Sequence, residues 1–537
     1  MLDTTAVTLE TSVIPMIPQP QSLRTLPAPV PALSVISTPE PADVLEQAIR
    51  AYVPAPGHAP ADSKKFRRFA SQLLEWTASA PLGRTMPEHS PRELVHCQIL
   101  GTSMRSIVLR LRYRHARTGQ VMRVVVKHFR RRDSLHNSGG FGLARELAAA
   151  RHFSALTDGA LPGYYTHSES LRAIVLEDSS ASFADPVPLA RALASDDSVV
   201  RRSGFRALTE FYAALGGIPV DADAALAFRR ELASLDSRSP FPGGAASFSL
   251  ASRGAAKLFP ESAPAGETDP YTQLRFAFKR IAQPAFLARA TLANDELARA
   301  FAATRGADYM VSTGDFNPEN VLCSPSSLGF ASAVSSPAVP ARGVDAEGSG
   351  FVHRGMLFAE VMLGFPSSPA YPGYRVERER DMAPLYLALW GSRDLDADLA
   401  LDITLCTLMI ACTLIELYGR SERAALLPVL CSEAADFMQA LLAIALEDVP
   451  GESGAEPGNA ASVSSADEVV SEALLSEMAD AEGTEASAEH PELSLPDLSL
   501  PELSLPEIES QSLSAEYRAT LMPVIEEAIS RLRTLEV

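Results

Sequence analysis

The sequence predicts an α+β protein with two lobes: a small antiparallel sheet with one helix, followed by a larger, mainly helical lobe. Three observations support this fold class. Three strand-like segments follow one another between residues 94 and 129, a helical pattern and a further strand come next, and residues 188–305 and 382–446 are mainly helical. Strands grouped in this way are typical of α+β proteins, whereas a βαβ repeat would alternate strands with helices.

The elements of the small lobe can be predicted one by one. A helix is expected at residues 65–77, where Phe69, Leu73 and Trp76 cluster towards one side. Strands are expected at 94–100, 106–115 and 121–129, with a short turn after the first and the hairpin turn ARTGQ after the second. A polar, glycine-containing loop then leads into a helix at 143–156, and a strand ends near Asp178.

Composition divides the chain into five parts. The first is rich in Pro, Thr and Ser, and the fourth is acidic with a repeated LSLPE-like unit, so neither can bury enough apolar area to offset the entropy of ordering. We therefore expect a disordered arm at 1–60, the small lobe with its leading helix at 61–177, the helical lobe at 178–448, an acidic insertion at 449–512 and a final helix at 513–537 that packs on the helical lobe.

The charge distribution argues against nucleic acid as a partner. The net charge is −19, and the acidic insertion, which contains no Lys or Arg, carries most of it. No basic patch interleaved with aromatic residues occurs elsewhere. The Pro-rich and acidic segments remain candidate contacts for a protein partner, although a solvated spacer is the simpler interpretation.

The apolar and cysteine patterns favour a cytoplasmic protein that does not enter the membrane. The longest apolar run, 403–415, is too short to span a bilayer and is expected to be a buried helix. The five cysteines are odd in number and form no CxxC pair, which fits a reducing compartment without a disulfide framework or zinc site. The N-terminal residues show no signal-peptide pattern.

The most specific motif is TGDFNPENVL at residues 313–322. Asp315 and Asn320 are five residues apart, the spacing at which a kinase catalytic loop places one side chain on the acceptor hydroxyl and the other on a metal ion. A polar turn containing Gly and Pro is the alternative interpretation.

This segment resembles the HGDxHPxNVL loop of the aminoglycoside phosphotransferase family, whose relatives include choline and homoserine kinases. The resemblance covers roughly residues 91–447 and implies a protein-kinase-like fold that binds ATP and Mg²⁺. It also implies that Asp315 is the catalytic base or the residue that orients the hydroxyl, and that Asn320 is a Mg²⁺ ligand. Thr313 stands where the family usually has His.

A second acidic motif, VDAEGSGF at 344–351, resembles the family's IDFE or IDWE segment. The resemblance implies that Asp345 binds the metal that bridges the phosphates, although Ala346 replaces the usual aromatic residue. The long separation from Asn320 is explained if the low-complexity segment between them is an extended hairpin loop. The alternative is an ordinary surface acid.

Lys127 and Glu146 form the third predicted pair. Lys127 ends the strand sequence VVVK, which looks like the lysine-bearing VAIK strand of kinases, and Glu146 follows 19 residues later on the next helix. A lysine on a valine-rich strand is costly to bury unless it is paired, so each residue supplies a partner for the other. The resemblance implies that Lys127 binds the ATP phosphates and takes part in catalysis.

The phosphate loop and the hinge are weaker motifs. The sequence GTSMRSIV places Gly101, Ser103 and Ser106 where backbone amides and hydroxyls would hold phosphate, with Val108 over the adenine, but a generic hairpin turn fits equally well. Residues 174–178 resemble the hinge, where backbone groups around Glu177 would meet the adenine edge; a buried strand end is the alternative.

Taken together, the motifs predict transfer of the γ-phosphate of Mg-ATP to a hydroxyl of a small molecule. The rival hypothesis is a pseudokinase that binds nucleotide or acts as a scaffold without turnover, which Thr313, Ala346 and the poor glycine loop favour. A protein kinase is disfavoured because no APE-like segment follows Asp345. The sequence does not identify the acceptor.

Overall fold

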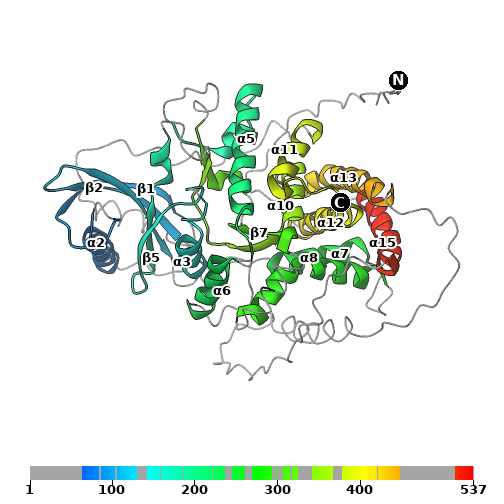
Figure 1. Ribbon diagram of the computed structural model, residues 1–537, viewed down its shortest axis with the longest axis horizontal. Coiled ribbons are helices and arrows are strands. Elements are labelled where there is room, and N and C mark those ends of the chain that lie inside the picture. Colours follow the sequence, from blue (N-terminus) through cyan, green and yellow to red (C-terminus); the bar gives the residue numbers. More distant parts are fainter. Residues whose placement is uncertain are drawn as a thin grey trace.

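The computed structural model shows a sheet-containing region and a helical region joined by a short linker (Figure 1). It describes residues 63–83, 86–102, 106–129, 142–157, 159–183, 185–220, 222–235, 245–260, 269–292, 299, 306–314, 317–324, 341–366, 378–419, 421–447 and 515–535. The arm predicted at 1–60, the acidic insertion at 449–512, Ser103 and Asp315 lie outside these residues.

Five antiparallel strands form the sheet in the order β1-β2-β3-β5-β4. Apolar residues alternate along β2, where Ile107, Leu109, Leu111 and Tyr113 are buried and the residues between them are half-buried or exposed; on β3, Val124 and Val126 are buried on the same side. The strands are β1 (Arg92–Thr102), β2 (Ser106–His115), β3 (Val121–Phe129), β4 (Tyr164–Ser168) and β5 (Ala173–Glu177).

Two helices cover opposite faces of this sheet. Helix α2 (Ser63–Ser79) packs its buried residues Ala70 and Leu73 against Leu109 and Val126. Helix α3 (Leu143–His152) packs Leu147 and its neighbours against the other face, which carries Ile174, Leu176 and Phe129. We call this second side the α3 face of the sheet.

The helical region buries the largest core of the described residues. Its helices are α4 (Leu189–Leu193), α5 (Ser198–Gly216), α6 (Asp223–Leu235), α7 (Ala245–Leu258), α8 (Pro270–Leu292), α10 (Arg354–Met362), α11 (Arg378–Trp390), α12 (Ala397–Tyr418), α13 (Leu427–Glu447) and α15 (Ala515–Arg533). Helix α15 returns to pack against α13, α8 and α7 through Ile525, Ile529 and Leu532.

Helix α12 contains the long apolar run of the sequence. Its most hydrophobic window is 89% buried among the other helices, as expected for the core helix of a folded lobe. The segment Ala424–Ala445 also meets the length and hydropathy of a membrane span, and half of its window is buried inside the protein.

Short strands bring the loops between the helices together. Strand β7 (Tyr309–Ser312) pairs with β10 (Gly350–His353), and β8 (Val321–Cys323) pairs with both β6 (Val187–Pro188) and β9 (Ala341–Gly343). All these pairs are antiparallel. They place the two acidic motifs of the sequence beside each other.

Candidate active site

A row of directly opposed residues crosses the sheet on its α3 face. Val108 lies opposite Lys127, and Lys127 lies opposite Ile174. Opposed residues in antiparallel strands share a face, so Val108 and Lys127 point to the same side. Val108 and Val125 are only half-buried there, whereas Leu109 and Val126 on the α2 side are fully buried.

Lys127 is the centre of a cluster of carboxylates. Its Nζ lies 2.6 Å from Oε2 of Glu146, 2.8 Å from Oδ1 of Asp345 and 3.5 Å from Oε2 of Glu347. Glu146 comes from α3, and the other two acids come from the loop after β9. The ion pair predicted between Lys127 and Glu146 is therefore present, and it joins the sheet, α3 and the Asp345 loop.

The environment favours the charged form of Lys127. Burial alone would lower the pKa of its ammonium group, but the carboxylates of Asp345, Glu146 and Glu347 outweigh burial and raise that pKa. Burial raises the pKa of Glu146, and Lys127 offsets only part of this effect. The cluster therefore brings three carboxyl groups to one ammonium group.

Antiparallel pairing of β8 with β9 brings Asn320 next to the Asp345 motif. Val321 lies opposite Gly343, and the Val344 amide donates to the Asn320 carbonyl oxygen at 2.9 Å. These contacts span the low-complexity segment that separates the two motifs in the sequence. The sequence-based explanation of that segment as the loop of a hairpin agrees with this pairing.

The motif that begins at Thr313 also lies against the Asp345 loop. Gly314 adopts a φ of 77°, and a Cβ placed there would lie 1.7 Å from the Gly348 carbonyl oxygen. Only glycine fits this close approach of two backbones. Thr313 is buried directly after β7, and Asp315, the candidate base that follows Gly314, lies outside the described residues.

Helix α3 holds the Asp345 loop through a second side chain. Arg145, adjacent to Glu146, is fully buried and donates to the carbonyl oxygens of Gly348 and Ser349. Burial lowers the pKa of its guanidinium to about 9. The helix is thus linked to the loop indirectly, through Glu146 and Lys127, and directly, through Arg145.

The other residues predicted to bind the phosphates and the adenine are not among the ion-pair partners of Lys127 in the part of the chain that the structure describes. Gly101 lies opposite Val108, and Ser106 is buried opposite Phe129 at the start of β2. Ser103, between them in the sequence, lies outside the described residues. Glu177 ends β5, but its carboxylate is engaged by Arg342 at 2.7 Å and by the Gly163 amide at 3.1 Å.

Sequence reasoning missed Glu347, Arg145 and Arg342. Glu347 had a weak signal, because it follows Asp345 by two residues in VDAE. The two arginines had none, since each acts on groups more than 150 residues away in the chain.

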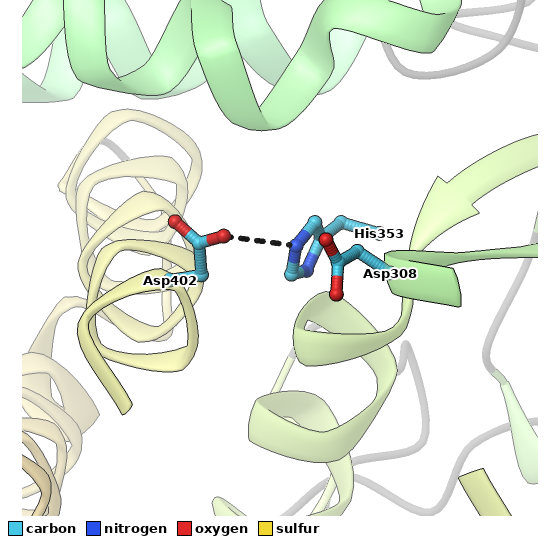
Figure 2. Close-up of side chains that lie close together, drawn as sticks. All are labelled: Asp308, His353 and Asp402. Atoms are coloured by element: carbon cyan, nitrogen blue, oxygen red, sulfur yellow. Dashed lines mark ion pairs between the residues drawn. The ribbon is translucent and has the colours of Figure 1, made fainter. Parts of the chain in front are cut away.

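A second group of titratable side chains lies in the helical region (Figure 2). His353 faces Asp402 of α12, with 3.6 Å between Nε2 and Oδ2, and Asp308 lies close by. Arg280 already pairs with Asp402, and Arg393 with Asp308, so the formal charges of the acids are cancelled. We assign this group to structure: His353 caps α10 by accepting from the Gly355 amide, and its ring lies edge-on to Tyr309.

The sheet order, the Lys127–Glu146 pair on strand and helix, and the mainly helical remainder together define a kinase-like fold (Figure 1).

No protein-family model matches the chain, and no curated protein matches its sequence. Among solved structures, the chain is similar to choline kinase from Cryptosporidium parvum Iowa II. The sequence identity is 9%, the match covers 70% of this chain and 94% of the other, and the TM-score is 0.34. At this TM-score, function has to be inferred from the site itself.

Proposed function

We propose that the protein is an ATP-dependent phosphotransferase that moves the γ-phosphate of Mg-ATP to a hydroxyl of a small molecule. The observation that carries the proposal is the bridging position of Lys127, whose ammonium group contacts both Glu146 and Asp345. Phosphoryl transfer requires a fixed cation for the phosphates together with carboxylates for a metal ion. Both are present at one place.

The carboxylates differ in what they can reach. The Glu146 side chain is 1% exposed and serves to hold Lys127, whereas the Asp345 side chain is 27% exposed. One oxygen from each of Glu146, Asp345 and Glu347 lies within 4.8 Å of the other two. Hard oxygen ligands of this kind suit Mg²⁺, so the residues present fit the ion that the proposal requires.

In this proposal Asp345 and Asn320 hold the ion, and Glu347 is a further ligand within reach. A bound Mg²⁺ would neutralise charge on the phosphate oxygens as the terminal phosphoryl group leaves. Lys127 would then exchange its contact with Asp345 for phosphate oxygens while it stays paired with Glu146. Such fixed charges lower the barrier without needing to reorganise during the reaction.

The α3 face supplies a surface for the nucleobase. Val108 and Val125 are half-buried, apolar and next to Lys127 in the sheet, which fits the flat face of adenine. We propose that the turn from Gly101 to Ser106, with Ser103, covers the phosphates. Backbone groups near Glu177 would meet the edge of the base.

Asp315 is the proposed contact of the acceptor hydroxyl. It follows Gly314, whose backbone packs directly on Gly348 in the Asp345 loop. The acceptor is proposed to be a small molecule because neither basic patches nor a protein-kinase activation segment are evident in the sequence.

Nucleotide turnover with a panel of hydroxylated small molecules tests the proposal. Wild-type protein should transfer phosphate to at least one class of acceptor. Asp315→Asn should lower turnover by about 100-fold or more and leave Mg-ATP affinity within a few-fold, because it removes a contact made with the reacting hydroxyl. The exposed Asp394→Asn is the control and should match wild type. Tight Mg-ATP binding without turnover on any acceptor would instead support a nucleotide-binding pseudokinase.

A further inference from the structure

Two adjacent acids at the end of β5 are each held by an arginine from a different part of the chain. Glu177 is the last residue of β5, and Asp178 begins the linker that leads through the short 3₁₀ turn Ser179–Ser182 into the helical region. Asp178 is 1% exposed. A buried carboxylate is costly unless it is paired and hydrogen-bonded, so both acids need partners.

Arg110 supplies the partner of Asp178 from the sheet side. Its Nε lies 2.8 Å from Oδ2 of Asp178, and its Nη2 donates to the Ser180 hydroxyl at 2.8 Å. Arg110 lies two residues after Val108 on β2 and directly opposite Val125. It therefore extends from the α3 face of the sheet, beside the proposed nucleobase surface, across to the linker.

Arg342 supplies the partner of Glu177 from the other side. Its Nη2 lies 2.7 Å from Oε2 of Glu177 and its Nη1 lies 3.0 Å from Oε1, a bidentate arrangement. Nη1 also donates to the Ser182 hydroxyl, so one guanidinium holds the end of β5 and the last residue of the turn. Arg342 is on β9, three residues before Asp345, and its side chain is 7% exposed.

We propose that Arg110 and Arg342 are positioning residues that fix the linker between the nucleobase surface and the Asp345 loop. This inference rests on the proposed function. Arg110 ties the linker to the strand that carries Val108, and Arg342 ties it to the strand that carries the metal-binding loop. A guanidinium that contacts a carboxylate through two nitrogen atoms fixes both the distance and the orientation of the two groups. A lysine, with a single ammonium group, cannot reproduce this.

The two arginine–carboxylate pairs also neutralise the negative charge of Glu177 and Asp178 near the proposed nucleotide site. Two bare carboxylates at the end of β5 would repel the triphosphate, and the two arginines neutralise them. Loss of either arginine would leave a buried or half-buried acid and free the linker to move, so one of the contacts that set the distance between Val108 and Asp345, alongside the Lys127–Asp345 pair, would be lost.

Mg-ATP affinity, measured by calorimetry on the full chain at a temperature where each variant is folded, tests the inference. Arg110→Ala should weaken binding by about tenfold, which corresponds to about 1.4 kcal/mol. Arg110→Lys should recover only part of the loss. Asp178→Asn should weaken binding as much as Arg110→Ala, and the double variant should be no weaker than either single variant, because the two residues act as one pair.

Arg112→Ala is the matched control. Arg112 lies on the same strand and the same face as Arg110, but it is exposed and lies opposite Arg123, away from the linker. Removing it deletes the same charge and should change affinity by no more than about twofold.

The outcomes separate this inference from the proposed function. A purely structural role would lower the melting temperature of Arg110→Ala and leave the affinity of the folded protein unchanged, which would overturn the inference alone. If Arg110→Ala does not fold, Arg110→Lys and Asp178→Asn decide by the same criterion. Failure of wild-type protein to bind Mg-ATP would overturn the proposed function, and this inference with it.

Discussion

Lys127 shows how a charged side chain is kept inside a sheet. It follows three valines on the strand, and isolated burial would favour the neutral amine. Glu146 and Asp345, which are remote in the sequence, supply the opposing charge at 2.6 and 2.8 Å. A buried pair of this kind contributes little net stability, but removing one partner leaves an uncompensated charge.

Lys127→Met should therefore destabilise the protein by about 3–5 kcal/mol, because buried Glu146 loses its cation. Adding Glu146→Gln to Lys127→Met should recover most of that loss. Urea denaturation of the two variants measures the difference. Equal stability of the single and double variants would show that the pair is not what the buried site requires.

The pH dependence of Lys127→Met follows from Glu146. Burial raises the pKa of Glu146 above its unfolded value, and loss of Lys127 should raise this pKa further. A raised folded pKa means that the folded state binds the proton more tightly, so this contribution to stability is present at low pH and is lost as pH rises through the folded pKa. The folded pKa of Glu146 is already about 8 in wild type, so the deficit of Lys127→Met should shrink as pH falls towards 8 from above and then change little down to about pH 5. A deficit that does not change above pH 8 would contradict this account.

The sequence predicted the Lys127–Glu146 pair because VVVK resembles the lysine-bearing strand of kinases and Glu146 follows 19 residues later on the next helix. Strand β3 and helix α3 are the elements that carry the two residues. Arg342 and Glu177 are 165 residues apart, and neither lies in a motif that indicates the other. Contacts of that kind depend on the packing of the two regions and leave no local pattern.

At the scale of elements, the close contact between the end of β7 and the Asp345 loop sets the geometry of the candidate site. Ser312 lies opposite Gly350, and Gly314 approaches Gly348 so closely that no side chain fits. The glycine at 314 is therefore required both for its positive φ and for the space.

Gly314→Ala tests this contact. The matched control is Gly391→Ala, because Gly391 also has a positive φ but has free space around it. Gly391 has a φ of 65°, and a Cβ there would meet nothing within 4 Å. Gly391→Ala should cost about 1–2 kcal/mol from its left-handed backbone alone. Gly314→Ala should cost more and should also weaken Mg-ATP binding, because the Asp345 loop must move.

Unfolding free energies and nucleotide affinities of the two glycine variants provide the comparison. If Gly314→Ala and Gly391→Ala lose the same stability and bind Mg-ATP alike, the packing of the two backbones does not position Asp345.

Most elements of the sheet region followed from sequence pattern, but one strand of the five-stranded sheet was missed. Strands β1, β2 and β3 were predicted from β-branched and alternating residues, as was α3 from its apolar run. Strand β4 (Tyr164–Ser168) is short, and all five of its residues are half-buried, so it shows no alternation of buried and exposed positions. Its place at the edge of the sheet comes from pairing with β5.

At the scale of the whole molecule, the α3 face of the sheet and the Asp345 loop of the helical region meet in the contact between Lys127 and Asp345. The α+β class and the order of the two regions were predictable because strands and helices are grouped in the sequence. The pairing of β8 with β9 across a low-complexity segment was expected only through the resemblance of the two acidic motifs to one family.

Mg-ATP affinity of wild type and Asp345→Ala, each with and without Mg²⁺, is the most direct test of the central claim that Lys127 and Asp345 form a nucleotide and metal site. Wild-type protein should bind more tightly with Mg²⁺, and ligand at 100 times its dissociation constant should add about 2.7 kcal/mol of stability. Asp345→Ala should lose the Mg²⁺-dependent part of binding while Lys127 keeps its pair with Glu146. Equal affinity of Asp345→Ala and wild type in the presence of Mg²⁺ would contradict the metal-binding role, and with it the account of the site.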